Sequence, residues 1–246
     1  VEDSKEICDF LYNYLLNDYE VIIANNGIKG LEKASDELPD IIISDVMMPK
    51  MNGIEMCNHL KTNEDTSHIP VLLLTAWTSE EFEKRGLEWG ADDYIKKPFN
   101  PEILKLKIRN ILEYRDKLRH KFQNQPDTLP EEVTSTPLDE DFLSKAVTEV
   151  RSNLNNNDFN LKYFAGKMNK SLAQLYVKIN AITGLTVAEF IVRIRLEQAV
   201  SLMKNDQLKV SDAAFKSGFN DLSHFYRCFK KQYKKSPGDY LNSLKN

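Results

Sequence analysis

Five polar side chains stand where short apolar runs end, in the first hundred residues of the chain. The acidic pair Glu2-Asp3 comes first, and Asp45, Thr75 and Lys97 each close a later run. The carboxyl ends of parallel strands meet at one edge of a sheet, which is where ligands bind in open α/β folds. We therefore expect three acids, a hydroxyl and a lysine to form one site, suited to a metal ion and a phosphoryl group.

The acids have the donor set that magnesium prefers. Mg²⁺ takes an octahedron of oxygens from one or two carboxylates, phosphate and water. Asp3 and Asp45 can bind such an ion directly, Glu2 through a water molecule and Met47 through its backbone carbonyl. The ion would offset the repulsion between an anionic phosphoryl donor and the Asp45 carboxylate, which is the main barrier to the transfer. The pattern thus predicts a magnesium-assisted phosphoryl acceptor at Asp45.

Thr75 and Lys97 complete the predicted site. The lysine can pair with one phosphoryl oxygen, and the threonine can donate a hydrogen bond to another. Pro98 makes the Lys97–Pro98 bond a candidate for a cis peptide, which would set the direction of the lysine. Taken singly, each of these residues is more often a helix cap, a strand end or a surface turn. Their joint order at successive strand ends favours the site.

The first 122 residues alternate short apolar runs with amphipathic stretches. The apolar runs lie at 20–24, 41–44, 71–74 and 94–95. Stretches with the helical period lie at 5–16, 28–37, 53–62 and 79–89. This alternation predicts an α/β fold with a doubly wound, parallel, five-stranded sheet. Its first strand should precede the acidic pair, where only Val1 stands, so we expect a piece of a longer polypeptide or a chain without its first residues.

A long helix is predicted to begin at Pro101 and to run towards Phe122. Residues at alternating spacings of four and three form one face of it: Leu104, Ile108, Ile111, Arg115, Leu118 and Phe122. As far as Ile111 this face suits packing on the helix's own sheet, and beyond it a short coiled coil. The polar stretch 123–137 that follows contains three prolines and is typical of a linker.

Length and charge both favour two domains, at 1–122 and 138–246. A chain of 246 residues exceeds the usual single-domain size. Residues 1–137 carry a net charge of −10 and residues 138–246 one of +6, which is typical of a regulatory module joined to a nucleic-acid binder.

Three scattered cysteines without CxxC spacing argue against a disulfide scaffold or a zinc site. No run is apolar enough to span a bilayer and nothing resembles a signal peptide, so we expect a cytoplasmic chain without membrane contact.

After residue 138 the chain is predicted to be helical throughout and to contain two segments of one design. Each segment is a helix, a tight polar turn and a second helix, at 161–182 and 210–231. Ser171 is expected to cap the second helix of the first segment. Two helix-turn-helix units held apart by a helix at 187–204 can enter successive major-groove segments of DNA. An all-helical interaction module with two αα-hairpins fits the pattern equally well.

The first 122 residues resemble the receiver domains of two-component response regulators. The matching residues are Glu2-Asp3, Asp45 to Gly53, Thr75-Ala76 and Asp93 to Phe99. The resemblance implies that Asp45 accepts a phosphoryl group from a histidine kinase with the help of Mg²⁺. It also implies that Thr75 and Tyr94 form a switch pair, in which the threonine is drawn to the phosphate and the ring turns inward.

Residues 140–244 are similar to the AraC/XylS-type DNA-binding domain. The segments that carry the similarity are 175–176, 185–191, 193–196, 199–203, 218–221, 223–225, 227–231 and 236–240. The similarity implies that two sets of side chains face successive groove segments: Ala173, Tyr176 and Val177, then Leu222, Ser223, His224 and Arg227. Gln174 shares the free face of the first set. Val177 stands in place of a common arginine and Lys234 in place of a usual glycine, and Arg227 is the strongest candidate for a base or phosphate contact.

The two halves together predict a phosphorylation-dependent, DNA-binding transcription regulator. Phosphorylated Asp45 would favour a homodimer on double-stranded DNA beside RNA polymerase, with the helix 104–122 transmitting the change. The donor kinase is either a separate protein or an upstream part of the same polypeptide, in which case the chain is the C-terminal output portion of a hybrid sensor kinase. An enzyme is disfavoured, because a phosphatase would need a second acid near Asp45, where Val46-Met47 offers none, and no glycine-rich loop follows a strand.

Overall fold

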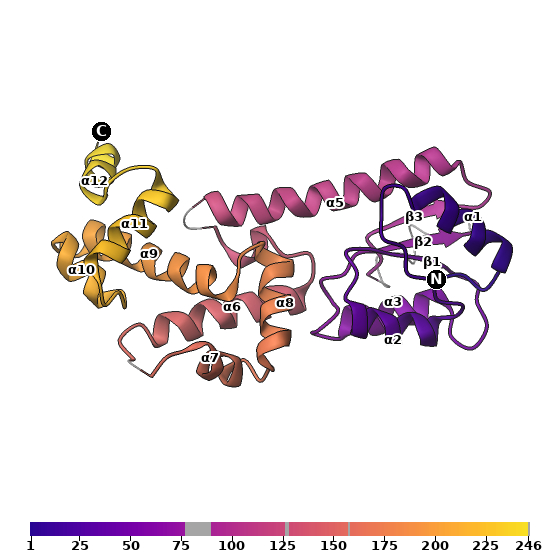
Figure 1. The fold of residues 1–246 in the computed structure, drawn as a ribbon, viewed down its shortest axis with the longest axis horizontal. Helices are drawn as coiled ribbons and strands as arrows, with labels where there is room; N and C mark the ends of the chain where they lie inside the picture. Colours follow the sequence, from indigo (N-terminus) through magenta and orange to yellow (C-terminus); the bar gives the residue numbers. More distant parts are fainter. Residues whose placement is uncertain (77–89, 126–127, 157, 246) are drawn as a thin grey trace. The chain divides into compact units, whose positions relative to one another are not determined.

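The computed structural model describes residues 1–76, 90–125, 128–156 and 158–245 (Figure 1). The chain divides into two compact units, Val1–Lys117 and Leu118–Asn246. The helix expected at 79–89 lies outside the described residues. In the parts of the chain that are described, no single helix is long and apolar enough to cross a membrane, and α8 (Leu172–Thr183) and α9 (Val187–Asn205) meet that test only as a pair bent by 59°.

The first unit is built on a parallel sheet, as the alternating pattern predicts. Its strands are β1 (Ile42–Asp45), β2 (Val71–Thr75) and β3 (Asp93–Lys96), side by side in that order. The register sets Asp45 beside Leu74 and Thr75 beside Lys96. All five residues of β2 are buried, as expected for a parallel strand covered on both faces. The carboxyl ends of the three strands therefore lie at one edge.

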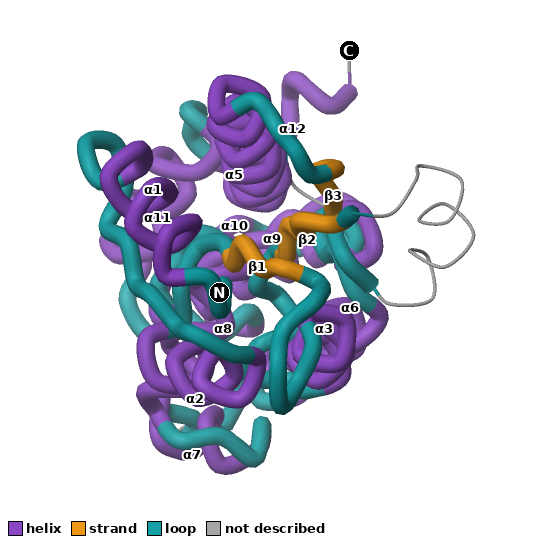
Figure 2. Tube along the Cα trace, turned by 90° about the vertical axis from the view of Figure 1, so that its right-hand side faces the viewer, coloured by secondary structure: helices purple, strands orange, loops and turns teal. Residues whose placement is uncertain are grey.

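Helices cover both faces of this sheet, so the doubly wound fold is confirmed (Figure 2). Successive side chains of a strand point to opposite faces, and β2 follows this rule. Val71 and Leu73 pack with α2 (Gly27–Glu37) and α3 (Gly53–Thr62), whereas Leu72 and Leu74 pack with α1 (Lys5–Leu15) and the first half of α5 (Pro101–Asn124). The expected spacing of buried residues in α5 is present at Leu104 and Ile108.

The described residues form three strands, where five were predicted. The apolar run at 20–24 has no strand ladder, and its one described backbone bond of this kind runs from Glu2 N to Ala24 O, 3.0 Å. On the other side, the Val1 amino group donates to Ile43 O and Asp45 N donates to Val1 O. A ladder needs a neighbouring strand, and only Val1 and Glu2 lie between 20–24 and β1. The space beside them is an apolar groove of about 390 Å³.

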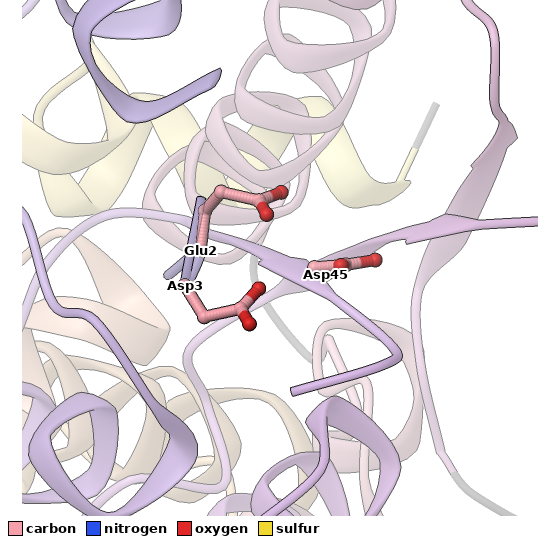
Figure 3. A group of neighbouring side chains, drawn as sticks. All are labelled: Glu2, Asp3 and Asp45. Atoms are coloured by element: carbon pink, nitrogen blue, oxygen red, sulfur yellow. The ribbon is translucent and has the colours of Figure 1, made fainter. Parts of the chain in front are cut away.

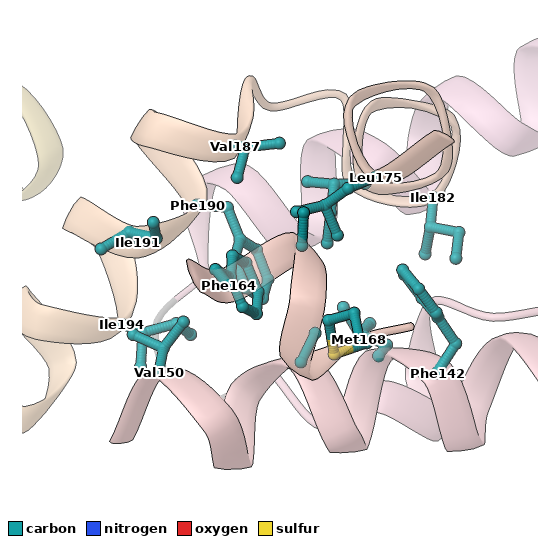
Figure 4. Close-up of a cluster of buried hydrophobic side chains, with 14 of the residues drawn as sticks. Phe142, Val150, Phe164, Met168, Leu175, Ile182, Val187, Phe190, Ile191 and Ile194 are labelled. Atoms are coloured by element: carbon teal, nitrogen blue, oxygen red, sulfur yellow. The ribbon is translucent and has the colours of Figure 1, made fainter. Parts of the chain in front are cut away.

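In the described residues of the second unit all regular structure is helical. After a short 3₁₀ turn (Pro130–Glu132) come α6 (Pro137–Ser152), α7 (Leu161–Lys167), α8 (Leu172–Thr183), α9 (Val187–Asn205), α10 (Val210–Lys216), α11 (Leu222–Tyr233) and α12 (Pro237–Lys245). They enclose two apolar cores. The first lies among α6, α7, α8 and the first half of α9 (Figure 4), and the second among the rest of α9, α10, α11 and α12. The predicted intervening helix is thus α9, which supplies one side of each core.

The long helix α5 reaches Asn124, and its two ends belong to different units. Arg115, expected as a charged interruption of the coiled-coil face, donates from its guanidinium to the carbonyl of His68 in the first unit. Phe122 is 2% exposed and lies in the first core of the second unit. Val133, within the stretch predicted as a linker, is 3% exposed in the same core. A face with spacings of four and three suits a core as well as a coiled coil, which is why the sequence did not separate the two.

One ion pair is fully buried in the first core of the second unit. Lys178 of α8 donates to a carboxylate oxygen of Asp139 in α6, and both side chains are 2% exposed. Removing one partner of such a pair leaves a buried charge behind, which costs far more than the pair contributes. The pair therefore ties α8 to α6 in one arrangement.

Lys178→Met is expected to lower the free energy of unfolding of the second unit by about 3–5 kcal/mol, because Asp139 then stays buried without its lysine. The double variant Lys178→Met/Asp139→Leu holds no buried charge and is expected to lie within about 2 kcal/mol of the wild type. Calorimetric unfolding of the three chains measures both effects. A single variant as stable as the wild type would contradict this assignment.

Candidate functional site

Glu2, Asp3 and Asp45 lie together where β1 ends (Figure 3). One carboxylate oxygen of each lies within 4.8 Å of the others. Glu2 and Asp45 are buried, at 3% and 7% exposure, whereas Asp3 is exposed. The grouping that the sequence predicts is therefore present, with an opening to solvent on the side of Asp3.

Backbone hydrogen bonds hold Asp45 at this edge. Its N–H donates to Val1 O at 2.9 Å, and the next N–H, of Val46, donates to Leu74 O at 2.9 Å. The start of α3 closes over it, since Gly53 N donates to Val46 O at 3.0 Å. A Cβ on Gly53 would stand 2.0 Å from the carbonyl oxygen of Asp45. The sequence shows Asn52-Gly53 as an ordinary turn signal, and only the fold reveals that Asp45 requires the glycine.

Lys97 lies between the two buried carboxylates. Its Nζ is 2.9 Å from Glu2 Oε2 and 3.1 Å from Asp45 Oδ1. Burial lowers the pKa of Lys97, but the hydrogen bonds and charges of Glu2 and Asp45 outweigh it and raise the pKa above its usual value. The lysine is therefore a cation in this site. The expected cis bond between Lys97 and Pro98 is present, and Lys97 N donates to Thr75 O at 2.7 Å.

The two residues expected to act as a switch pair lie in adjacent strands. Thr75 ends β2 and is fully buried. Tyr94 is half-buried in β3 beside Leu73, with Lys107 Nζ 5.9 Å from its ring centre. Met47, whose backbone carbonyl was expected to bind a metal, lies two residues after Asp45 with a side chain that is 66% exposed.

The donor set fits a divalent cation. Three carboxylates meet one lysine, so the site keeps an excess of negative charge, and all the donor atoms are hard oxygens of the kind that Mg²⁺ prefers. The exposed position of Asp3 leaves room for water, which Mg²⁺ retains in most protein sites. The arrangement can hold an ion beside a carboxylate and a charged lysine.

In the second unit, α7 with α8 forms the first of the two predicted helix-turn-helix segments. Ser171 caps α8 as expected, and its N–H donates back to the Gln174 side chain at 3.0 Å. Leu175 is fully buried in the first core, whereas Ala173, Tyr176 and Val177 are exposed. Gln174 is also exposed, but its carbonyl oxygen serves this cap. The expected free face of α8 is therefore available.

The second segment is α10 with α11. Phe225 and Phe229 are fully buried, and Ser223 and Arg227 are exposed. His224 is partly buried and meets the ring of Phe219 edge-on, with centroids 5.7 Å apart. Leu222, grouped with the DNA-facing residues in the sequence, packs against the second core.

Lys234 ends α11 as a glycine would. It adopts a left-handed conformation with φ 58°, and its N–H donates to Lys230 O. Helices often end with a residue in this conformation, which a non-glycine residue reaches at a small cost. The replacement of the usual glycine therefore leaves the helix end intact and adds a positive charge.

Comparisons with known proteins find a match for each half of the chain. Residues 1–109 match the family model of the response regulator receiver domain, and residues 164–243 match that of a helix-turn-helix domain. The chain is 41% identical over 242 residues to histidine kinase P4 of Formosa agariphila, an alignment that covers 98% of this chain and 18% of that protein. It is 45% identical over 114 residues to the alkaline phosphatase synthesis transcriptional regulatory protein PhoP of Bacillus subtilis, covering 46% of each.

A third relative is matched over most of its length. The chain is 33% identical over 165 residues to the response regulator ArlR of Staphylococcus epidermidis, covering 66% of this chain and 69% of that protein. The chain therefore belongs to the response regulators of two-component systems, and its output domain is an AraC-type helix-turn-helix domain. It spans less than a fifth of the kinase it resembles and less than half of PhoP.

Gly53→Ala is expected to lower the free energy of unfolding of the first unit by about 2 kcal/mol or more, because the new Cβ forces the backbone of Asp45 to move. Gly166→Ala in α7 is the matched control, since a Cβ there meets no atom within 4 Å. That change should leave the second unit equally stable or up to about 1 kcal/mol more stable. Differential scanning calorimetry measures both, and equal effects of the two substitutions would contradict the close approach at Asp45.

Proposed function

We propose that this chain is a phosphorylation-controlled, DNA-binding transcription regulator and that Asp45 accepts the phosphoryl group. One observation carries the proposal. The Asp45 carboxylate lies 3.1 Å from Lys97 Nζ and shares a cluster of carboxylates with Glu2 and Asp3. A nucleophilic carboxylate beside a cation and a set of metal-binding oxygens is the arrangement that phosphoryl transfer requires.

In the proposed transfer an Asp45 oxygen attacks the phosphorus of a phosphohistidine in the partner kinase. The P–O bond to Asp45 forms as the P–N bond breaks, and the leaving imidazole takes up a proton from solvent. Glu2, Asp3, Asp45 and the Met47 carbonyl would hold Mg²⁺, which supplies positive charge to the transferring group. Lys97 would move its ion pair from Asp45 to a phosphoryl oxygen, and the Thr75 hydroxyl would donate to another.

The consequence of phosphorylation is proposed to run through Thr75 and Tyr94. Thr75 ends the strand next to β1, and its movement towards the phosphoryl group would leave space on the sheet that the Tyr94 ring can enter. This change favours a homodimer of receiver units, which would place two output domains on repeated sites in DNA. RNA polymerase is the proposed partner of the DNA-bound dimer, in the cytoplasm.

The proposed DNA-reading surfaces are the exposed faces of α8 and α11. Ala173, Tyr176 and Val177 would face one groove segment, and Ser223, His224 and Arg227 the next. The exposure of most of these side chains supports the assignment, as does the net charge of +6 on residues 138–246. Phosphate contacts position such a domain, and base contacts make it specific. Gln174 and Leu222 are proposed to shape the ends of the two faces.

A second candidate concerns the parent polypeptide. The alignment with histidine kinase P4 covers nearly all of this chain and lies within a protein more than five times as long. We therefore propose that this chain is the output portion of a hybrid sensor kinase, in which the phosphodonor belongs to the same polypeptide. A separate kinase is the alternative. The length of the open reading frame around the encoding sequence distinguishes the two.

Incubation with a small acyl phosphate and Mg²⁺ is expected to phosphorylate the wild-type chain once, as measured by intact mass spectrometry. Asp45→Asn should abolish the reaction, and Asp3→Ala should slow it by about tenfold or more at limiting Mg²⁺, because the ion loses a ligand. Asp40→Asn, which changes an exposed acid outside the cluster, is the control. Modification that survives hydroxylamine, or that persists in Asp45→Asn, would rule out an acyl phosphate on Asp45.

Arg227→Ala is expected to weaken binding to a specific duplex by about 1–3 kcal/mol, the discrimination that one good base contact provides. The duplex is the one that the wild-type chain enriches from random-sequence DNA. Lys145→Ala removes an equal charge from the exposed surface of α6 and serves as control. Fluorescence anisotropy at fixed salt gives the affinities, and an Arg227→Ala chain that binds as the control does would refute the contact.

A further inference from the structure

The end of α5 is part of the DNA-reading unit. We name residues 118–125 the α5 end. Its Phe122 is 2% exposed and stacks on Phe190 of α9, with centroids 6.1 Å apart and ring planes 10° apart. The guanidinium carbon of Arg193, also in α9, lies 3.7 Å from the centre of the same ring. Phe122 is therefore a member of the first core.

The α5 end also satisfies the last carbonyls of α8. The final four carbonyls of a helix have no partner within the helix. Arg119 Nε donates to Ala181 O at 2.9 Å, and Gln123 Nε2 donates to Thr183 O at 3.1 Å. The approach requires Gly184, whose φ is 66°, because a Cβ there would stand 2.3 Å from Gln123 Nε2. The C-terminal end of α8, the first of the two proposed DNA-reading helices, is thus capped by the α5 end. The second proposed reading helix is α11.

The same glutamine is bonded to the second reading helix. Gln232, in the last turn of α11, donates from Nε2 to the backbone oxygen of Gln123 at 2.7 Å. Gln123 therefore joins the C-terminal ends of α8 and α11, through its side chain on one side and its main chain on the other. A contact from Lys231 to Glu189 also links α11 to the start of α9, but both side chains are exposed and such pairs contribute little.

We propose that Gln123 is a positioning residue that fixes the spacing between the two reading helices, and hence the register in which the chain reads DNA. This inference rests on the proposed function. The two helix-turn-helix segments belong to separate cores joined along α9. A single connecting helix lets the two faces pivot about it. The bridge through Gln123 adds a second connection, which restricts that pivot.

The test compares affinity for two duplexes with the full chain. The first is the duplex that the wild-type chain enriches from random-sequence DNA. The second carries one extra base pair between the two segments that footprinting shows to be contacted. The insertion shifts one contacted segment of the DNA relative to the other by about 3.4 Å along the duplex axis and rotates it by about a tenth of a turn. We expect it to weaken wild-type binding by about tenfold or more, as one defective base-pair position does.

Two variants cut the bridge at different points. Gln123→Ala removes the bond to α8, and Gln232→Ala removes the bond to α11. In each variant the inserted base pair is expected to weaken binding by only about threefold or less. The reason is that α8 and α11, once less tightly connected, can adapt to both spacings of the DNA segments. Gln125→Ala is the matched control, since its side chain is exposed and its backbone oxygen still accepts from Arg193. It should keep the wild-type penalty.

The ratio between the two duplexes separates positioning from general loss of structure, which weakens binding to both alike. If Gln123→Ala and Gln232→Ala keep the wild-type ratio, the inference is overturned while the proposed function stands. Gln123→Glu has the same size but no side-chain donor, and it provides a second test if the alanine variant unfolds. A wild-type chain that enriches no sequence contradicts the proposed function, and this inference with it.

Discussion

The pairing of Lys97 with two buried carboxylates is the constraint around which the first unit is organised. It joins three segments far apart in sequence, because Glu2, Asp45 and Lys97 reach the same point from the start of the chain, from β1 and from the end of β3. Buried carboxylates are costly unless they are paired, so the strand register that brings these residues together is also the register that is stable. One lysine cannot balance both carboxylates and Asp3. The excess of negative charge at this edge is therefore a consequence of how the sheet is held together.

The second unit is held together mainly by apolar packing around one shared helix. Two small cores share α9, with Ile194 in one and Leu196 in the other. Each helix-turn-helix segment buries its apolar face against this helix, so neither is a separate domain. The buried pair of Lys178 and Asp139 holds the inner face of α8 against α6. The outer face of α8 is exposed to solvent, and its Gln174 side chain takes part in the helix cap.

Much of this arrangement could be predicted from local patterns. The buried run of β2, the cap at Ser171, the clustered acids and the exposed faces of α8 and α11 follow from periodicity and from residue types. What the sequence hides depends on partners that are distant along the chain. The sequence gives Lys178 no feature that distinguishes it from an exposed lysine, and its burial depends on Asp139 of α6. Residues 20–24 have the composition of a strand, but a hydrogen-bonded ladder also requires a neighbouring strand. Phe122 fits a coiled-coil face and a core equally well, so its place could not be deduced. The site roles remain predictions.

The position of Phe122 has a consequence for how such proteins can be rearranged. The apparent linker begins at residue 123, and a gene fusion made there would separate Phe122 and Arg119 from the core and the helix end they complete. The transplanted output domain would carry a hole in its interior, and the Ala181 carbonyl at the end of α8 would lose its Arg119 donor. The portable module therefore begins inside a helix, at Leu118. Any new receiver joined to it must therefore end in a helix that continues into Leu118.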